Sequence, residues 1–204
     1  MANKLYNFSC DVSAGRLVGC QSAIGGIQKI YLSSYDAEIL NKFNFGAGAS
    51  LYELSEIKGA VTVKQFDLRP NTASYNATIT TSDENGTMFY EQVLEVALAQ
   101  INNKDLSYIN NLAQGRCQAF VLDANDDVFL MGARFGCTVT GGAMSTGQAK
   151  ADRSGWTLTF TAQEQINYMC KPTAGVGTAK YPFDAVTETG GGAFTINAGD
   201  YPTA

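Results

Sequence analysis

Residue types that commonly carry chemistry are sparse in this chain, and the densest group is the segment "DANDD". It places three carboxylates and an amide within five residues, at Asp123, Asn125, Asp126 and Asp127. Oxygen ligands of this kind suit a calcium ion, but the segment lacks the twelve-residue spacing and the closing glutamate of an EF-hand loop. Because Asp and Asn also favour tight turns, we interpret the segment as the turn of a hairpin.

A second chemical possibility is a pair of carboxylates that hydrolyses a glycoside, formed by these aspartates or by Glu53 and Glu56. The two glutamates lie along a predicted strand, where acidic side chains are usually solvated. The chain has no histidine, which excludes Ser-His-Asp triads, histidine-assisted cysteine nucleophiles and zinc sites that contain histidine. We therefore predict no catalytic, cofactor-binding or metal-binding residue and no small-molecule substrate.

Glycine-rich and aromatic motifs lead to the same result. "GAGAS" (46–50) and "GVGTAK" (175–180) lack the spacing of a dinucleotide-binding loop and the G-K-[ST] ending of a phosphate-binding loop, so both are predicted loops. Trp156 could stack on a sugar, but it alternates with Leu158 and Phe160, which favours a place in the core.

Cysteine usage and charge narrow the class of protein. The five cysteines form no C-x-x-C pair, and their odd number in a chain without a secretion signal predicts reduced, mostly buried thiols; they are Cys10, Cys20, Cys117, Cys137 and Cys170. With 14 basic and 19 acidic residues, the net charge of −5 does not suit a nucleic-acid binder. No apolar run is long enough to span a membrane, so we expect a protein made and kept in a cytoplasm.

The elements that position these residues are predicted to be mainly strands. A chain of 204 residues with 45% hydrophobic residues and 21 glycines fits a β-rich globular fold. Residues 27–35, 50–57, 59–70 and 72–82 have the β-branched and aromatic content of strands. The segments on either side of "ANDD" predict a hairpin, and "WTLTFTAQEQ" predicts a strand with one buried face and one threonine face.

Two helices are expected to flank the strands. Asn85-Gly86 is predicted to end the sheet, with Thr87 as the cap of a main helix over 87–101. This helix is apolar on most of its circumference and therefore needs cover on more than one side. We expect Val93, Leu94 or Leu98 to face a neighbouring subunit. A short second helix is predicted over 104–113.

Composition divides the chain into a β domain over 1–170 and a C-terminal extension over 171–204 that is rich in Gly, Thr, Ala and Pro. Within the extension, "AFTINAG" alternates Phe194 and Ile196 with polar residues, as expected for an edge strand. It can add to the sheet of its own subunit or to that of a neighbour. We favour the neighbour, which would make Phe194 and Ile196 interface residues.

The order of motifs resembles a known family. The segments are "ENGTMFYEQVL", "LAQGRCQAFVLDANDDVFLMG" and "TGGAMSTGQAKADRSGWTLTFTAQE". They are similar to segments of the tail tube proteins of tailed bacteriophages, over roughly residues 10–165. Trp156 and Ala162 depart from the closing motif of the family, and residues 171–204 lie outside the similarity.

The resemblance implies an antiparallel β-sandwich or barrel with a flanking helix, of the kind shared by type VI secretion and contractile injection tubes. It also implies a virion protein, assembled in the host cytoplasm, that forms hexameric rings stacked around a lumen. Its partners would be itself and other tail or neck proteins, with DNA passing through without specific binding. Three alternatives stay open: another virion component such as a neck ring, connector or capsid decoration protein; a carbohydrate-binding module; and a histidine-free enzyme.

Overall fold

A computed structural model describes residues 24–45, 52–57, 59–101, 103–170 and 194–198. These residues form a mainly β fold, as the sequence predicts, with one α-helix where two were expected. In chain order the elements are β1 (Ile27–Ser34), η1 (Ile39–Lys42), β2 (Phe43–Phe45), β3 (Glu53–Ile57), β4 (Val61–Asp67), β5 (Ala73–Ser82), β6 (Thr87–Ala99), α1 (Asn103–Gln114), β7 (Cys117–Asp123), β8 (Val128–Met131), β9 (Thr138–Ser145), β10 (Gly155–Glu164), β11 (Tyr168–Cys170) and β12 (Phe194–Ala198).

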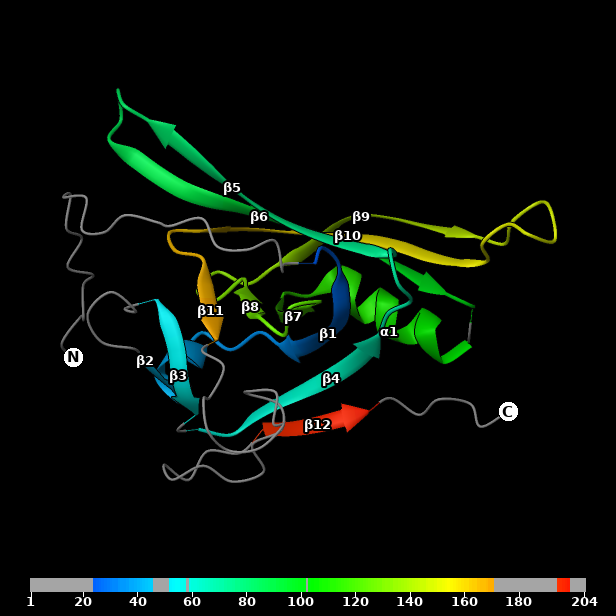
Figure 1. The fold of residues 1–204 in the computed structure, drawn as a ribbon, viewed down its shortest axis with the longest axis horizontal. Helices are drawn as coiled ribbons and strands as arrows, with labels where there is room; N and C mark the ends of the chain where they lie inside the picture. Colours follow the sequence, from blue (N-terminus) through cyan, green and yellow to red (C-terminus); the bar gives the residue numbers. More distant parts are fainter. Residues whose placement is uncertain (1–23, 46–51, 58, 102, 171–193, 199–204) are drawn as a thin grey trace.

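The strands form two sheets that pack on one another (Figure 1). An eight-stranded sheet has the order β12-β4-β1-β7-β8-β11-β3-β2, and a four-stranded sheet has the order β5-β6-β10-β9. Most neighbours are antiparallel, but β11 pairs with β3 and β12 pairs with β4 in parallel. The predicted sandwich is therefore correct in class, although its larger sheet is mixed rather than purely antiparallel.

One hydrophobic core lies between the two sheets. Alternate residues of β6 and β10, such as Leu94, Val96 and Phe160, meet Leu32 of β1 and Val121 of β7. Leu94 and Phe160 are fully buried. Strict alternation in β10 is what allows one face of this strand to enter the core, because successive side chains of a strand point to opposite faces.

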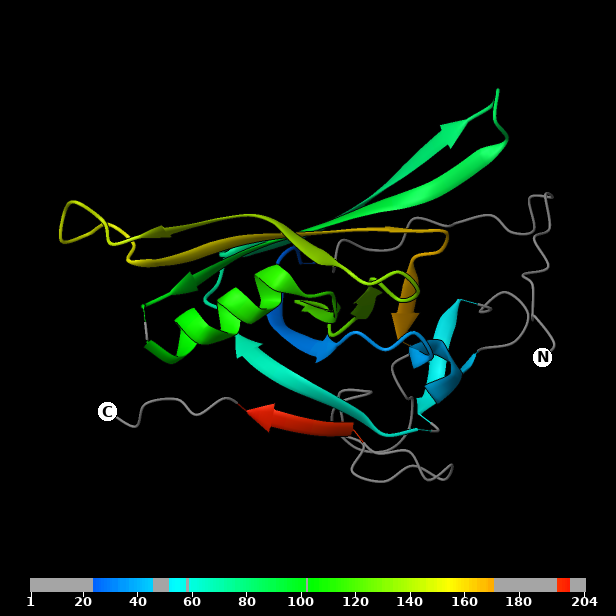
Figure 2. The ribbon, with the colours of Figure 1, turned by 180° about the vertical axis from the view of Figure 1, so that it is seen from behind.

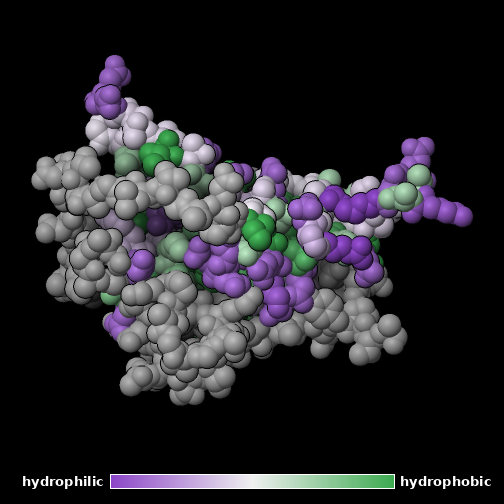
Figure 3. All heavy atoms as spheres, in the orientation of Figure 1, coloured by the Kyte–Doolittle hydropathy of each residue, from purple (hydrophilic) through white to green (hydrophobic). Residues whose placement is uncertain are grey.

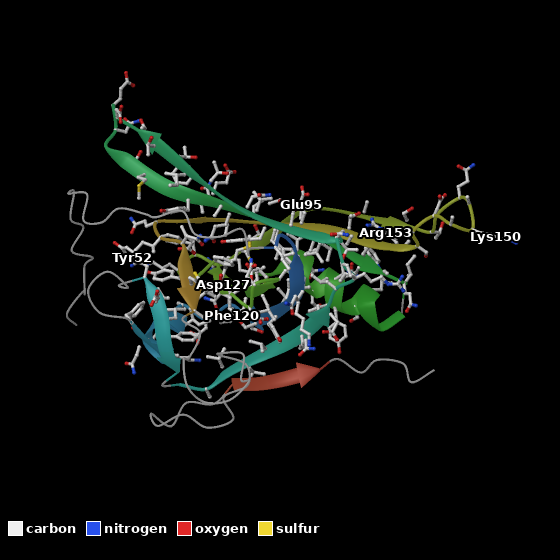
Figure 4. All side chains as sticks on the ribbon, in the orientation of Figure 1. Tyr52, Glu95, Phe120, Asp127, Lys150 and Arg153 are labelled. Carbon is white, nitrogen blue, oxygen red and sulfur yellow. The ribbon has the colours of Figure 1, made fainter. Side chains whose placement is uncertain are left out.

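A second core lies on the other face of the eight-stranded sheet. It joins Phe120 of β7 and Val63 of β4 to Phe43 of β2 and Leu54 of β3. Since β2 and β4 stand near opposite ends of the strand order, the sheet must curl to bring these residues together. Phe120 lies at the centre of the molecule (Figure 4). Burial on both faces explains why residues 119–122 of β7 are continuously apolar.

Helix α1 confirms the predicted second helix over 104–113. Its Ile109 is buried and Leu112 is half-buried against the core between the sheets. Figure 2 shows α1 beneath the four-stranded sheet. The helix therefore helps to close the core between the sheets.

The predicted main helix over 87–101 is wrong, because Thr87–Ala99 forms strand β6. Asn85-Gly86 does not end the sheet. It lies in the turn of the β5–β6 hairpin, where Gly86 adopts a φ of 59°. Ten residues of β6 pair with β5 and ten pair with β10. The segment is rich in apolar residues because it is a central strand. Its face toward the core consists of Leu94, Val96 and Leu98.

Two hairpins extend beyond the packed layers. The β5–β6 hairpin projects at one end of the four-stranded sheet, and the β9–β10 hairpin projects at the other (Figure 1). At the edge of the larger sheet, β12 confirms the strand predicted from "AFTINAG". It pairs with β4 of the same chain, from Phe194 opposite Val61 to Ala198 opposite Gln65.

Candidate assembly interface

The four-stranded sheet presents its second face to solvent. Because Leu94 and Phe160 point into the core, the residues that alternate with them point outward. The outward set includes Ser74, Asn76 and Thr78 on β5, Phe89, Glu91, Val93 and Glu95 on β6, and Thr157, Thr159, Thr161 and Gln163 on β10. We call this surface the polar face. Its threonines correspond to the threonine face predicted from the sequence.

Charge on the polar face is entirely acidic. None of the four strands contains Lys or Arg. Glu91 and Glu95 are the charged residues of the outward set, and both are exposed. Figure 4 shows Glu95 on the outer side of the sheet. This face therefore has no cation on its strands to bind phosphate.

Both lateral edges of this sheet are open among the described residues. β5 pairs only with β6, through ten residues, and β9 pairs only with β10. Each edge therefore offers a row of backbone N–H and C=O groups to a further strand. A row of this kind is a template for pairing with another chain.

Buried glutamines fix the connection that leads into β9. The side-chain oxygen of Gln92 on β6 accepts the Gly132 N–H at 3.0 Å. The amide of Gln118 on β7 donates to the Ala133 carbonyl at 3.2 Å. Both glutamines are fully buried. These bonds satisfy backbone groups that burial would otherwise leave without partners.

Glu164, at the end of β10, completes this arrangement. Its Oε1 accepts the N–H groups of Arg134 and Phe135, each at 2.8 Å. The residue is only 1% exposed, and its Oε2 has no hydrogen-bond partner. Burial raises the pKa of Glu164, and this effect outweighs the two N–H donors, which lower it. The carboxyl therefore positions the start of β9 from within the protein.

Asn167, in the connection between β10 and β11, binds two strands of the four-stranded sheet. Its Oδ1 accepts hydrogen bonds from Tyr75 of β5 at 2.9 Å and from Gln92 of β6 at 3.0 Å. Burial raises the pKa of Tyr75, so its hydroxyl stays protonated and keeps donating. This network could not be predicted from the sequence, because a glutamine or tyrosine on a strand does not reveal its partner.

The residues predicted as interface contacts fall in different environments. Leu94 is fully buried in the core of its own subunit and cannot face a neighbour, because it packs between the sheets. Leu98 also packs against that core, whereas Val93 lies half-buried on the polar face. Phe194 and Ile196 lie on β12 beside β4, and their side chains are outside the described part of the chain.

The residues that the sequence suggested for metal binding, glycoside hydrolysis or sugar stacking lie in turns, strands or the core. Asp123 accepts the N–H groups of Asn125 and Asp127, each at 2.8 Å, which forms the predicted turn between β7 and β8. Glu53 lies on β3. Trp156 packs against the core between the sheets, as predicted. The loop "GAGAS" falls within 46–51 and "GVGTAK" within 171–193, both outside the described residues.

Three cysteines are buried free thiols, as predicted; Cys10 and Cys20 lie outside the described residues. The backbones of Cys117 and Cys137 pair in an isolated antiparallel β-bridge, and the two Sγ atoms lie 3.3 Å apart without a disulfide bond. The hydrogen bond with Cys117, together with burial, raises the pKa of Cys137. Burial likewise raises the pKa of Cys170. These thiols behave as small apolar groups of the core.

A groove of about 600 Å³ lies between α1, β1 and β4. In its lining, the Lys64 ammonium lies 4.7 Å from the ring centroid of Tyr108, and the Arg116 guanidinium lies 4.4 Å from that of Tyr35. Each cation thus packs on an aromatic ring of the protein itself.

No protein-family model, curated protein or solved structure matches this chain. Among the residues that the structure describes, no helix is long and apolar enough to cross a membrane. In that same part of the chain, no three or more His, Cys, Asp or Glu side chains are grouped so that they could hold a metal ion.

Proposed function

We propose that this protein is a structural virion subunit, the tail tube protein of a tailed bacteriophage. Its copies form rings, six to a ring, and the rings stack into the conduit for DNA ejection. The single observation that carries the proposal is the four-stranded sheet, which has two open edges among the described residues and an outward face of uncharged or acidic side chains.

Pairing of the β5 edge of one copy with the β9 edge of the next would continue the sheet around a ring. Six copies would contribute roughly 24 strands, spaced by about 4.8 Å and tilted by about 40°, which gives a barrel about 50 Å across. The polar face would line such a barrel if the second sheet and α1 lay outside. A DNA duplex would then meet threonines and glutamates, which repel phosphate or leave it unbound.

The edge contact can be tested with a lysine pair. Ala143→Lys adds a charge to edge strand β9, which is a device that keeps natural edges from pairing. Gln163→Lys adds the same charge to an exposed position on central strand β10. Negative-stain microscopy should show rings or tubes for the wild type and Gln163→Lys, and far fewer for Ala143→Lys.

Circular dichroism must first confirm that both variants are folded. Monomeric wild-type protein at all concentrations would overturn the proposal. Trimers would favour a capsid decoration protein instead. Equal assembly by the two lysine variants would contradict the role of the β9 edge while leaving a tube subunit possible through other surfaces.

A further inference from the structure

The two projecting ends of the four-stranded sheet carry opposite charge. One end is the turn between β5 and β6, residues 83–86, which we call the acidic turn. The other is the turn between β9 and β10, residues 146–154, which we call the basic turn. Figure 1 shows the two turns at opposite extremes of the molecule, and Figure 3 shows that both tips are hydrophilic.

The acidic turn belongs to a segment without cations. No Lys or Arg occurs between residues 71 and 102, and Asp83 and Glu84 are both exposed at the tip. The Asn85 side chain donates to Ser82 Oγ at 3.2 Å, which holds the turn. On the core side of the sheet, where the hairpin extends past the body, Ile79 is 55% exposed and Met88 is 44% exposed.

The basic turn carries Lys150 and Arg153, both exposed, against the single acid Asp152. The Asp152 carboxylate accepts the N–H groups of Ala149 at 2.7 Å and Gln148 at 2.9 Å. These two donors lower its pKa. Asp152 is thus engaged in shaping the turn, while neither Lys150 nor Arg153 forms an ion pair with another described residue.

An exposed apolar side chain also accompanies the basic turn. Met144 on β9 is 53% exposed and lies opposite Trp156 on β10. Trp156 faces the core between the sheets, so Met144 lies on that same side of the sheet. Each end of the sheet therefore combines a charged turn with exposed apolar side chains on the core side.

We propose that the acidic turn of one copy docks against the basic turn of a second copy of this chain. Asp83 and Glu84 would meet Lys150 and Arg153, and Ile79 and Met88 would cover Met144. This inference rests on the proposed function, for which it supplies the contact between successive rings. The occupant is a second copy because the complementary charges and the matching apolar residues belong to the same chain.

The contact joins two different surfaces, so it is head-to-tail and repeats without limit along a stack. Exposed ion pairs are individually weak and are screened by salt. A ring presents the contact once for each copy, and this multiplicity strengthens stacking. Tubes should therefore shorten as the ionic strength rises, while rings held by backbone pairing persist.

Charge reversal gives a sharp test. Asp83→Lys/Glu84→Lys makes both ends of the sheet basic, and Lys150→Glu/Arg153→Glu makes both ends acidic. Each variant alone should form rings but shorten tubes at least tenfold in negative-stain images. An equimolar mixture of the two should recover long tubes, because every basic end then finds an acidic end. The matched control is Glu38→Lys, which makes the same charge change as Glu84→Lys at an exposed residue beside η1, away from both turns.

Recovery in the mixture, together with normal tubes from Glu38→Lys, supports the contact. Long tubes from either reversed variant alone, or no recovery on mixing folded variants, overturns it. In both of those cases wild-type rings and tubes would still support the proposed function. A wild type that forms no rings at all would remove the proposed function and this inference together.

Discussion

Buried polar side chains of β6, β7 and β10 hold the connection from β8 to β9. Gln92 accepts the Gly132 N–H, and Glu164 accepts the N–H groups of Arg134 and Phe135. Backbone donors in such a buried connection cannot reach water, so each needs a protein acceptor. The place of β9, and hence of the open edge that it forms, depends on these few contacts.

Glu164→Gln should change the pH dependence of stability. Glutamine keeps an oxygen for the two N–H donors but has no titrating charge. Because the folded state raises the pKa of Glu164, the native protein binds this proton more readily than the unfolded chain does. The resulting stabilisation is present below the ordinary pKa of 4.5 and is lost as the pH rises through the folded pKa. Urea unfolding should therefore show wild type losing stability relative to the variant toward neutral pH.

Glu164→Leu is the control for the hydrogen bonds. It leaves two N–H groups without an acceptor, at a cost of about 1–3 kcal/mol for each group, and it should destabilise at every pH. A difference between wild type and Glu164→Gln that stays constant with pH would contradict the buried, titrating carboxyl.

At the scale of elements, β6 determines the architecture of the smaller sheet. Its thirteen residues connect β5 to β10, and its register with both neighbours puts Leu94 between Tyr75 and Phe160. Val93, one residue earlier, faces outward between Asn76 and Thr161. Adjacent residues therefore differ in burial, as the twofold alternation of a strand requires.

The variants Leu94→Lys and Val93→Lys should show whether residues 93 and 94 lie in a strand or in a helix. Leu94→Lys places a charge without a partner in the core between the sheets, which costs on the order of several kcal/mol. That is much of the usual stability of a domain, so the variant should be unfolded. Val93→Lys should change stability by about 1 kcal/mol or less, because its side chain can reach solvent. Thermal melts followed by circular dichroism measure both, and equal destabilisation by the two would contradict the alternation.

The elements with a clear pattern could be predicted from the sequence. Trp156, Leu158 and Phe160 alternate strictly with threonines, and β10 is a strand with one buried face. The second helix and the β7–β8 hairpin were likewise predicted, because their spacing or turn chemistry is local.

β6 was mispredicted for a physical reason. Glu91, Gln92, Leu94, Glu95 and Ala97 all favour helix in isolation. Pairing with strands on both sides overrides that preference, and local propensity does not record it. The hydrogen bonds to the β8–β9 connection are hidden in the same way, since Gln92 and Gly132 are separated by 40 residues and Arg134 and Glu164 by 30.

At the scale of the whole molecule, the two sheets differ in the length of their edge strands. In the described part of the chain, the larger sheet ends in β12, with five residues, and β2, with three, while the smaller sheet ends in β5, with ten, and β9, with eight. Short edge strands limit pairing with other chains. The long edges of the four-stranded sheet are therefore the better templates for the pairing that we propose.

The sequence interpretation favoured β12 as a strand given to a neighbouring subunit, whereas the structure pairs it with β4 of its own chain from Val61 to Gln65. This arrangement makes a clear prediction for a chain that ends at residue 170. Both cores should remain, because every described residue of the two clusters lies between 27 and 170. The truncated protein should therefore fold with a lower melting temperature, since β4 loses its outer partner. It should still form tubes, because the β5 and β9 edges and both charged turns are retained.

Circular dichroism measures the folding of the truncated protein, and negative-stain microscopy measures its tube formation. A disulfide trap shows whether β12 pairs with β4 of its own chain or of another copy. Thr62 lies opposite Thr195 in the β4–β12 register, so Thr62→Cys/Thr195→Cys brings two thiols within bonding reach. Oxidation of assembled wild-type-length protein should link the thiols within one chain and leave a monomer band on a non-reducing gel. Each single-cysteine variant controls for the natural thiols. A ladder of linked chains, together with poor polymerisation of the truncated protein, would show instead that β12 is exchanged between copies and ties the assembly together.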